Sequence, residues 1–205
     1  LLIASLVASA LAMHLLVRSV VCTESGAYLA GLAWGFWPFH FAHLIHLQLQ
    51  GMYFLPLAFL FLHRLIATTR RMDAVWLGVA VGLQAAASVY IGVIGAVGLA
   101  VGGIVLAVSV GRWRHAVLLR RVVLAVALAG VIVAPFTWPY LEVQRKEGFV
   151  RNLYQAGQNA ATPGHYLRVP PDNAVYGRTG MLRPAAAGAN QAEKGGPERE
   201  LFVGF

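Results

Sequence analysis

Charged residues are scarce in this chain, and acidic residues are the scarcest of them. Asp, Glu, Lys and Arg make up 12% of its 205 residues, whereas an ordinary soluble domain has about 25%. Hydrophobic residues reach 59%, and the mean hydropathy is +0.67. This composition favours a polytopic membrane protein over a soluble domain. The net charge of +8 does not indicate a nucleic-acid partner, because the basic residues lie between apolar runs in the pattern of membrane topology.

Cysteine occurs once, as Cys22, which excludes an internal disulfide and a metal site built from several cysteines. The acidic residues among residues 1–139 are Glu24 and Asp73 alone. No Walker loop or Gly-x-Ser-x-Gly nucleophile motif occurs in a usable context. A transferase that acts outside the cytoplasm needs an outward carboxylate as base or metal ligand, so the side of the membrane on which these two acids lie decides whether they qualify.

Six apolar segments predict membrane helices. A spanning helix needs about 20 apolar residues, within a range of about 17–25, so the second segment is short. Residues 74–110 carry no charge and would extend about 55 Å as one helix, nearly twice the roughly 30 Å hydrocarbon core. We therefore predict two helices there, joined by a tight turn at residues 88–92. The segments lie at about residues 1–17, 24–39, 47–66, 74–90, 91–110 and 116–137.

Basic residues mark alternate connections between these segments. They follow the first, third and fifth segments and are absent from the connections at residues 40–46 and 88–92. Because cytoplasmic loops carry an excess of Lys and Arg, residues 40–46 and 88–92 are predicted to lie outside the cytoplasm. Glu24 and Asp73 adjoin the basic connections and are predicted to lie on the cytoplasmic side. The basic residues are Arg18, Arg64, Arg70, Arg71, Arg112, Arg114, Arg120 and Arg121.

The composition changes at Tyr140, where the apolar segments give way to a polar tail. We predict an all-α, polytopic transmembrane bundle over residues 1–139 and an incomplete extracytoplasmic segment over residues 140–205. Residues 141–154 favour an amphipathic helix near the membrane surface, in which Glu142 and Lys146 have the i, i+4 spacing of an ion pair. The chain starts inside an apolar segment without Met and ends abruptly, and we expect it to be a fragment of a larger protein.

The most informative stretch is WPFHFAHLIHLQ at residues 37–48, with three histidines at spacing i, i+3, i+6. Polar, titratable groups beside a membrane are costly and mark functional sites by default. On a regular helix the first and third histidines lie about 120° apart, so neighbouring pairs share a face but all three do not converge. A tyrosine in the other outward connection is a candidate for the same cavity. The predicted substrate-binding residues are His40, His43, His46, Gln48 and Tyr90.

Three interpretations of the histidines stay open. In the first, they are interfacial side chains with polar tips in the headgroup zone and no specific ligand. In the second, the imidazoles and the Gln48 amide recognise a lipid-linked phosphate or sugar. In the third, they bind a metal, since imidazole is the commonest neutral metal ligand. No carboxylate lies nearby in sequence, so the sequence offers no complete ligand set for a divalent metal, and we expect no cofactor.

The histidine stretch, followed by Leu55-Pro56-Leu57 and His63-Arg64, resembles a bacterial family of polytopic membrane proteins. That family is related to the GT-C glycosyltransferases, which take sugars from polyprenyl-phosphate donors. Its members often show an aromatic-proline pair, spaced histidines, a His-x-Gln, and a Leu-Pro helix that ends in His-Arg. The Leu-Phe-x-Gly pattern at residues 201–204 also fits this resemblance.

The resemblance implies an integral protein of the bacterial cytoplasmic membrane, with its tail outside, that contacts membrane lipid and a polyprenyl-phosphate-linked sugar donor. The sugar would pass to an extracytoplasmic acceptor, and His40, His43, His46 and Gln48 would have donor-side or structural roles. In GT-C enzymes the catalytic Asp or Glu usually lies in the first outward loop, and we expect it upstream of Leu1. The alternative is a non-enzymatic membrane transporter or assembly component for lipid or polysaccharide.

Overall fold

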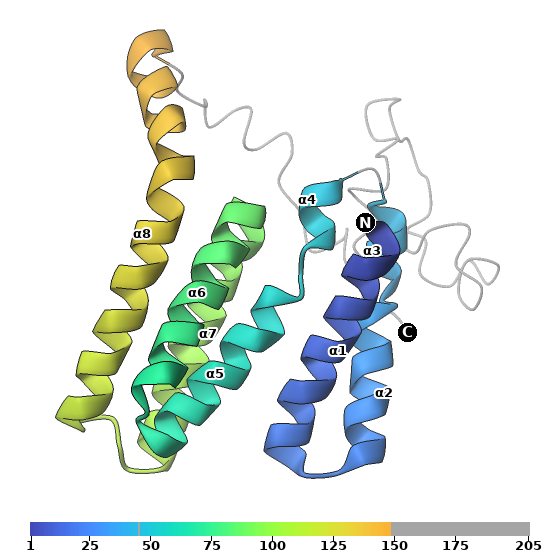
Figure 1. The fold of residues 1–205 in the computed structure, drawn as a ribbon, viewed down its shortest axis with the longest axis vertical. Helices are drawn as coiled ribbons and strands as arrows, with labels where there is room; N and C mark the ends of the chain where they lie inside the picture. Colours follow the sequence, from blue (N-terminus) through green and yellow to red (C-terminus); the bar gives the residue numbers. More distant parts are fainter. Residues whose placement is uncertain (45, 149–205) are drawn as a thin grey trace, which may run out of the picture. The chain divides into compact units, whose positions relative to one another are not determined.

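The computed structural model describes residues 1–44 and 46–148, and this part of the chain is helical without any strand. The compact unit Leu1–Lys146 contains nearly all of it (Figure 1). The predicted all-α class is therefore confirmed. The helices are α1 (Leu2–Val21), α2 (Glu24–Gly35), α3 (Pro38–Ala42), α4 (Leu47–Gln50), α5 (Phe54–Thr68), α6 (Arg71–Ala87), α7 (Val89–Ser109) and α8 (Ala116–Glu147).

Four stretches are long and apolar enough to cross a membrane: Leu2–Val21, Gln48–Thr68, Val89–Ser109 and Ala116–Lys146. The other two predicted segments are also helical, but α2 has 12 residues and α6 has 17. At about 1.5 Å per residue they extend about 18 Å and 25 Å, less than the roughly 30 Å of a hydrocarbon core. The polytopic membrane character is thus supported, and a total of six spans stays a prediction.

The exposed apolar surface of α7 agrees with its assignment as a membrane span. Val93, Ile94 and Val97 each leave 60–69% of their area exposed, on a helix with no charged residue. A monomeric soluble protein rarely exposes a continuous apolar patch of this kind. Such an apolar face is suited to contact with the hydrocarbon core of a membrane.

Tight turns reverse the chain between consecutive long helices. Cys22 and Thr69 end α1 and α5 in the left-handed conformation, with φ of 58° and 54°, and their N–H groups donate to the Arg18 and Leu65 carbonyls. Ser88 separates α6 from α7 in an extended conformation, and its Oγ accepts from the Ile91 N–H at 3.5 Å. The predicted division of this run into two helices is thereby confirmed, but the break is at Ser88 alone, and residues 89–92 form the first turn of α7.

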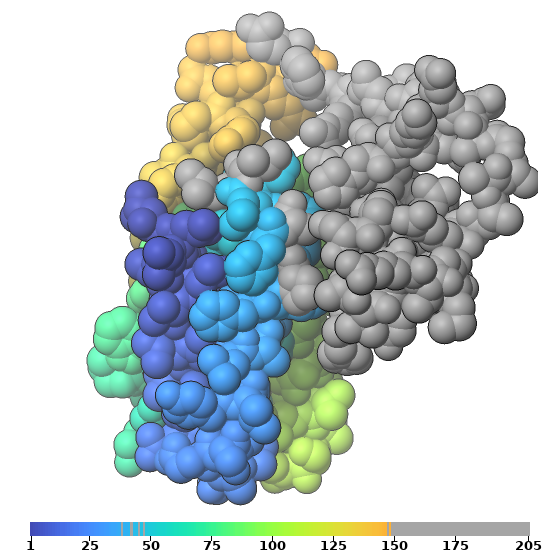
Figure 2. Space-filling view, turned by 90° about the vertical axis from the view of Figure 1, so that its right-hand side faces the viewer, coloured from blue at the N-terminus to red at the C-terminus, as the bar shows by residue number. Residues whose placement is uncertain are grey.

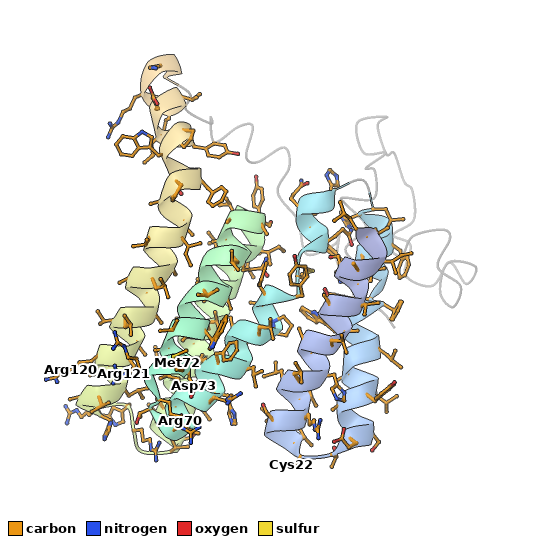
Figure 3. The ribbon with its side chains drawn as sticks, in the orientation of Figure 1. Cys22, Arg70, Met72, Asp73, Arg120 and Arg121 are labelled. Atoms are coloured by element: carbon orange, nitrogen blue, oxygen red, sulfur yellow. The ribbon has the colours of Figure 1, made fainter. Side chains whose placement is uncertain are left out.

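The basic connections gather at one end of this unit. Cys22, Arg70, Asp73, Arg120 and Arg121 all lie near that end in Figure 3. The α3–α4 segment and the turn between α6 and α7 lie at the opposite end (Figure 1). This is the alternation that the positive-inside prediction requires, while the side of the membrane that each end faces stays a prediction.

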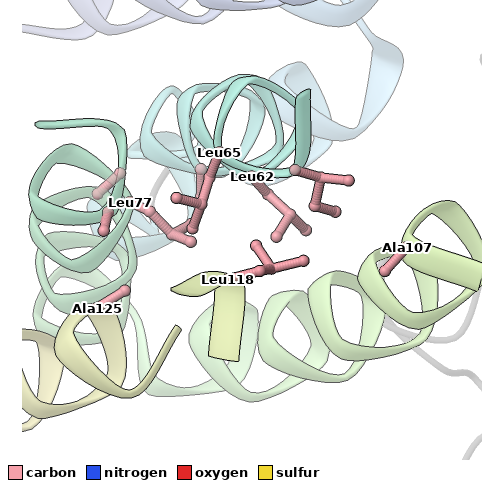
Figure 4. Packing of buried hydrophobic residues seen from close by; sticks show 10 residues of the cluster. Leu62, Leu65, Leu77, Ala107, Leu118 and Ala125 are labelled. Atoms are coloured by element: carbon pink, nitrogen blue, oxygen red, sulfur yellow. The ribbon is translucent and has the colours of Figure 1, made fainter. Parts of the chain in front are cut away.

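Small side chains allow the helices to approach closely. A Cβ on Gly78 of α6 would lie 2.6 Å from the Ala125 carbonyl oxygen of α8, and one on Gly92 of α7 would lie 2.7 Å from Cα of Ala85. In Figure 2 α1 and α2 lie side by side, in keeping with their extensive mutual packing. The main apolar cluster joins α5, α6, α7 and α8 (Figure 4) through residues that include Leu62, Leu65, Leu77, Ala107, Leu118 and Ala125.

Polar contacts fasten the helix pairs at the basic end. Arg18 Nε lies 2.8 Å from Glu24 Oε1 across the α1–α2 turn. The carboxylate of Asp73, which is 4% exposed, accepts from Thr68 Oγ1 at 2.8 Å and lies 3.4 Å from Arg64 Nε. Both acids are therefore engaged structurally at the end away from the histidines.

The last helix continues beyond its predicted end. Pro135 and Pro139 lie inside α8, which runs on to Glu147 instead of ending near residue 137. The predicted pair of Glu142 and Lys146 is present, with Nζ 2.7 Å from Oε1. Residues 141–147 thus continue α8 and do not form a separate amphipathic helix, since no break separates them from the preceding turns. The rest of that predicted helix and the tail at 149–205 lie outside the described residues.

Candidate functional site

The histidine stretch is broken into two short helical turns. Pro38 starts α3, which suits a residue that has no N–H to donate and a fixed φ. The helix ends after Ala42, where His43 takes φ −117°, and His46 precedes α4 with φ −99° and ψ 77°. The three imidazoles are therefore not arranged on one regular helix, and their relative positions follow from this break.

His40 is entirely buried and binds Gln50, which is 2% exposed. The Gln50 Nε2 group donates to the carbonyls of His40 at 3.0 Å and His43 at 2.9 Å. Since carbonyls only accept, these two bonds fix the direction of the amide and place its Oε1 3.0 Å from His40 Nδ1. The Nδ1 atom must then carry the hydrogen, because amide oxygen only accepts. Gln50 thus holds the turn between α3 and α4 together.

The tautomer of His40 has a further consequence. With the hydrogen on Nδ1, the Nε2 atom of the neutral ring has a lone pair, and this buried atom has no hydrogen-bond partner in the described part of the chain. Burial lowers the pKa of His40, and the Gln50 bond and the Trp34 backbone offset this in part. His40 is therefore a neutral residue that positions the turn.

His43 differs from His40 in its hydrogen-bond partner and in its exposure. Its Nδ1 lies 3.0 Å from the Phe39 carbonyl oxygen and must donate to it, so Nε2 of the neutral ring is an acceptor. The ring stacks on Phe39 with centroids 4.3 Å apart, and its centroid lies 6.1 Å from that of His46. His43 is half-buried, as is His46. The break after α3 therefore brings this pair of imidazoles together beside an aromatic ring.

One further polar contact joins this turn to the first helix: Ser5 Oγ of α1 donates to the Gln50 carbonyl of α4. Elsewhere in the helices, Ser9 Oγ of α1, Trp34 Nε1 of α2 and both amide atoms of Gln84 of α6 are buried without a hydrogen-bond partner among the described residues. Buried polar groups in proteins are nearly always paired, so each of these atoms is a place where a ligand or water can complete the hydrogen bonding.

The two remaining predicted residues lie on the surface. Gln48 is exposed on α4, and Tyr90 is 67% exposed in the first turn of α7. The structure does not bring them into the His40–Gln50 contact. Sequence reasoning missed Gln50, which lies two residues after Gln48 in Leu-Gln-Leu-Gln. The available signal was the second glutamine itself, directly before Gly51 and just outside the His-x-Gln pattern.

The described residues contain no group of three His, Cys, Asp or Glu side chains placed to hold a metal ion. The metal interpretation therefore gains no ligand set from this part of the chain. What the arrangement offers instead is hydrogen bonding by imidazole and amide groups.

No family model, curated protein or solved structure matches this chain. The likeness to GT-C-related proteins accordingly rests on the residues of the sequence.

Proposed function

We propose that this chain is part of an integral membrane glycosyltransferase of the GT-C type, which transfers a sugar from an isoprenoid-phosphate donor to an extracytoplasmic acceptor. The observation that carries the proposal is the polar turn built by His40, Gln50 and His43 at the end of an apolar helical unit opposite its basic loops. A donor with an isoprenoid tail stays in the membrane with its sugar phosphate at the membrane surface. The groups that bind this sugar phosphate must therefore lie at an end of the helical unit, as the polar turn does.

Within this proposal His43 and His46 contact the donor. The acceptor Nε2 of His43 suits a sugar hydroxyl, and an imidazole N–H of this pair suits a phosphate oxygen. His40 and Gln50 are positioning residues, because they are buried and engage the backbone of the turn. The proposal assigns no catalytic residue to this chain, and the base is expected from a carboxylate upstream of Leu1.

The test is sugar transfer by the full protein in proteoliposomes, with a panel of radiolabelled polyprenyl-phosphate hexoses and pentoses. His43→Ala and His46→Ala are expected to lower donor turnover at unchanged expression and folding. His115→Ala, which alters an exposed histidine at the basic end, serves as the matched control. Wild-type transfer rates in both test variants would refute the donor-side role.

The alternative is a non-enzymatic transporter or assembly component for lipid or polysaccharide. It is favoured by the positions of the acids, since Glu24 and Asp73 are paired at the basic end and Glu142 is paired with Lys146. None of these three carboxylates is left to act as a base beside the histidines. Saturable binding of a polyprenyl-phosphate sugar by the full protein, without transfer to any acceptor, would support the alternative over the enzyme.

A further inference from the structure

Two neighbouring hollows lie at the basic end, away from the histidine turn. The first, of about 380 Å³, is lined almost entirely by apolar side chains of α1, α5 and α7, such as Val17 and Phe59. The second, of about 260 Å³, lies between the last turns of α5 and α7 and includes Arg112. His63 and Leu106 line both hollows, so the two adjoin, and together they are called the groove, with an apolar part and a polar part.

The polar part contains two groups suited to an anion. His63 Nδ1 is buried and has no hydrogen-bond partner in residues 1–44 and 46–148. Arg112 Nη1 donates to the carbonyls of Ile66 at 2.8 Å and Ala67 at 2.5 Å. A guanidinium has three further N–H groups, on Nε and Nη2. The carbonyls at the end of α5 thus fix the position of Arg112, and the N–H groups on its Nε and Nη2 are left for an anion in the groove.

Two other cations at this end have acidic partners. Arg64, at the end of α5, is already paired with Asp73, and Arg18 is paired with Glu24. Arg112 has no acidic partner among the described residues, whose salt bridges involve other cations. Its charge is therefore the one at this groove that an external anion can neutralise.

We infer that this groove binds an anionic phospholipid. An acyl chain fills the apolar hollow between α1, α5 and α7, and the phosphate lies between the His63 imidazole and the Arg112 guanidinium. The charge of Arg112 favours an anionic lipid over a neutral one, because each basic group near a membrane surface raises the affinity for anionic headgroups roughly fivefold. The site is separate from the histidine turn and does not depend on the proposed sugar transfer.

The experiment measures lipid association with the full protein in vesicles of phosphatidylcholine, using spin-labelled phosphatidylglycerol and spin-labelled phosphatidylcholine as probes. The motionally restricted fraction of each probe gives its relative association constant. We expect the wild-type protein to prefer phosphatidylglycerol, and Arg112→Gln to reduce that preference roughly fivefold. Arg112→Lys, which keeps the charge, is expected to retain most of it.

Two matched controls separate the groove from the general basic charge of this end. Arg114→Gln removes an exposed cation that lies over Trp113 at 4.4 Å and is expected to reduce the preference less than Arg112→Gln does, because Arg114 does not line the groove. His63→Leu, which disturbs no hydrogen bond of the α5 end, is expected to reduce the preference, whereas His115→Leu is not. Equal association of the two probes with the wild-type protein, or equal losses in Arg112→Gln and Arg114→Gln, would overturn the inference.

Discussion

Replacement of Gln50 by Ala should destabilise the folded unit strongly. The amide of Gln50 serves three partners at once: His40 Nδ1 and the carbonyls of His40 and His43. Each buried polar group that loses its partner costs about 1–3 kcal/mol. Partial access of water to the half-buried His43 side reduces the sum, so we expect a loss of about 3 kcal/mol.

The matched control is Gln48→Ala, because Gln48 is exposed on the same short helix and surface substitutions usually change stability by less than about 0.5 kcal/mol. Gln50→Glu is expected to be at least as harmful as Gln50→Ala, since a carboxylate cannot donate to the two carbonyls. The measurement is thermal unfolding of the purified protein in detergent, with a shift of about 6–12 °C for Gln50→Ala. If Gln50→Ala and Gln48→Ala unfold within 2 °C of each other, the account of the α3–α4 turn is wrong.

Three further predictions test other parts of the structure. The pKa of His40 is lowered by burial, so as the pH falls His40 takes up a proton in the unfolded chain before it does in the folded one. The free energy of unfolding should therefore fall as the pH drops below about 6.5, by at most about 1.4 kcal/mol per pH unit. Between pH 7.5 and 5.5, the free energy of unfolding should depend less steeply on pH in His40→Gln than in the wild type. Asp73→Ala should cost about 2 kcal/mol in chemical unfolding, because it removes the buried carboxylate that binds Thr68 and Arg64. Glu142→Ala, which breaks an exposed pair, should change stability by less than about 0.5 kcal/mol. Equal effects of the two substitutions would contradict the assigned burial. Gly78→Ala should cost about 1–3 kcal/mol of stability through overpacking against α8. Its control is Gly130→Ala, where a Cβ meets nothing within 4 Å, and this substitution should be neutral or stabilising. Similar melting temperatures for the two variants would show that α6 and α8 do not pack closely.

The helical class and the turns were predictable because they follow from local composition. The uncharged run at residues 74–110 is too long for one membrane helix, and Ser88 divides it where expected. The Glu142–Lys146 pair followed from spacing alone. The end of α8 was not predictable in this way, because the apolar composition changes at Tyr140 while the helix itself continues to Glu147.

The sequence singled out the segment that contains the candidate site, but it did not predict the contacts that its side chains make. The sequence marked residues 37–48 by their histidines, since imidazoles are costly in an apolar setting. It did not show that the helix ends after Ala42, or that Gln50 in place of Gln48 turns inward to bind His40. These outcomes depend on which side chain can reach two free carbonyls across the break.

Local sequence is enough to predict that the described part of this chain is helical, with apolar helices of membrane length and basic residues in alternate connections, because hydropathy and charge act on each segment separately. Which polar atoms are buried, and what they bind, depends on the tertiary structure. The neutral tautomer of His40, the pairing of His43 with His46, and the groove that joins His63 to Arg112 all require residues from different turns or helices to meet. Such meetings depend on backbone breaks and interhelical packing, which no single segment contains.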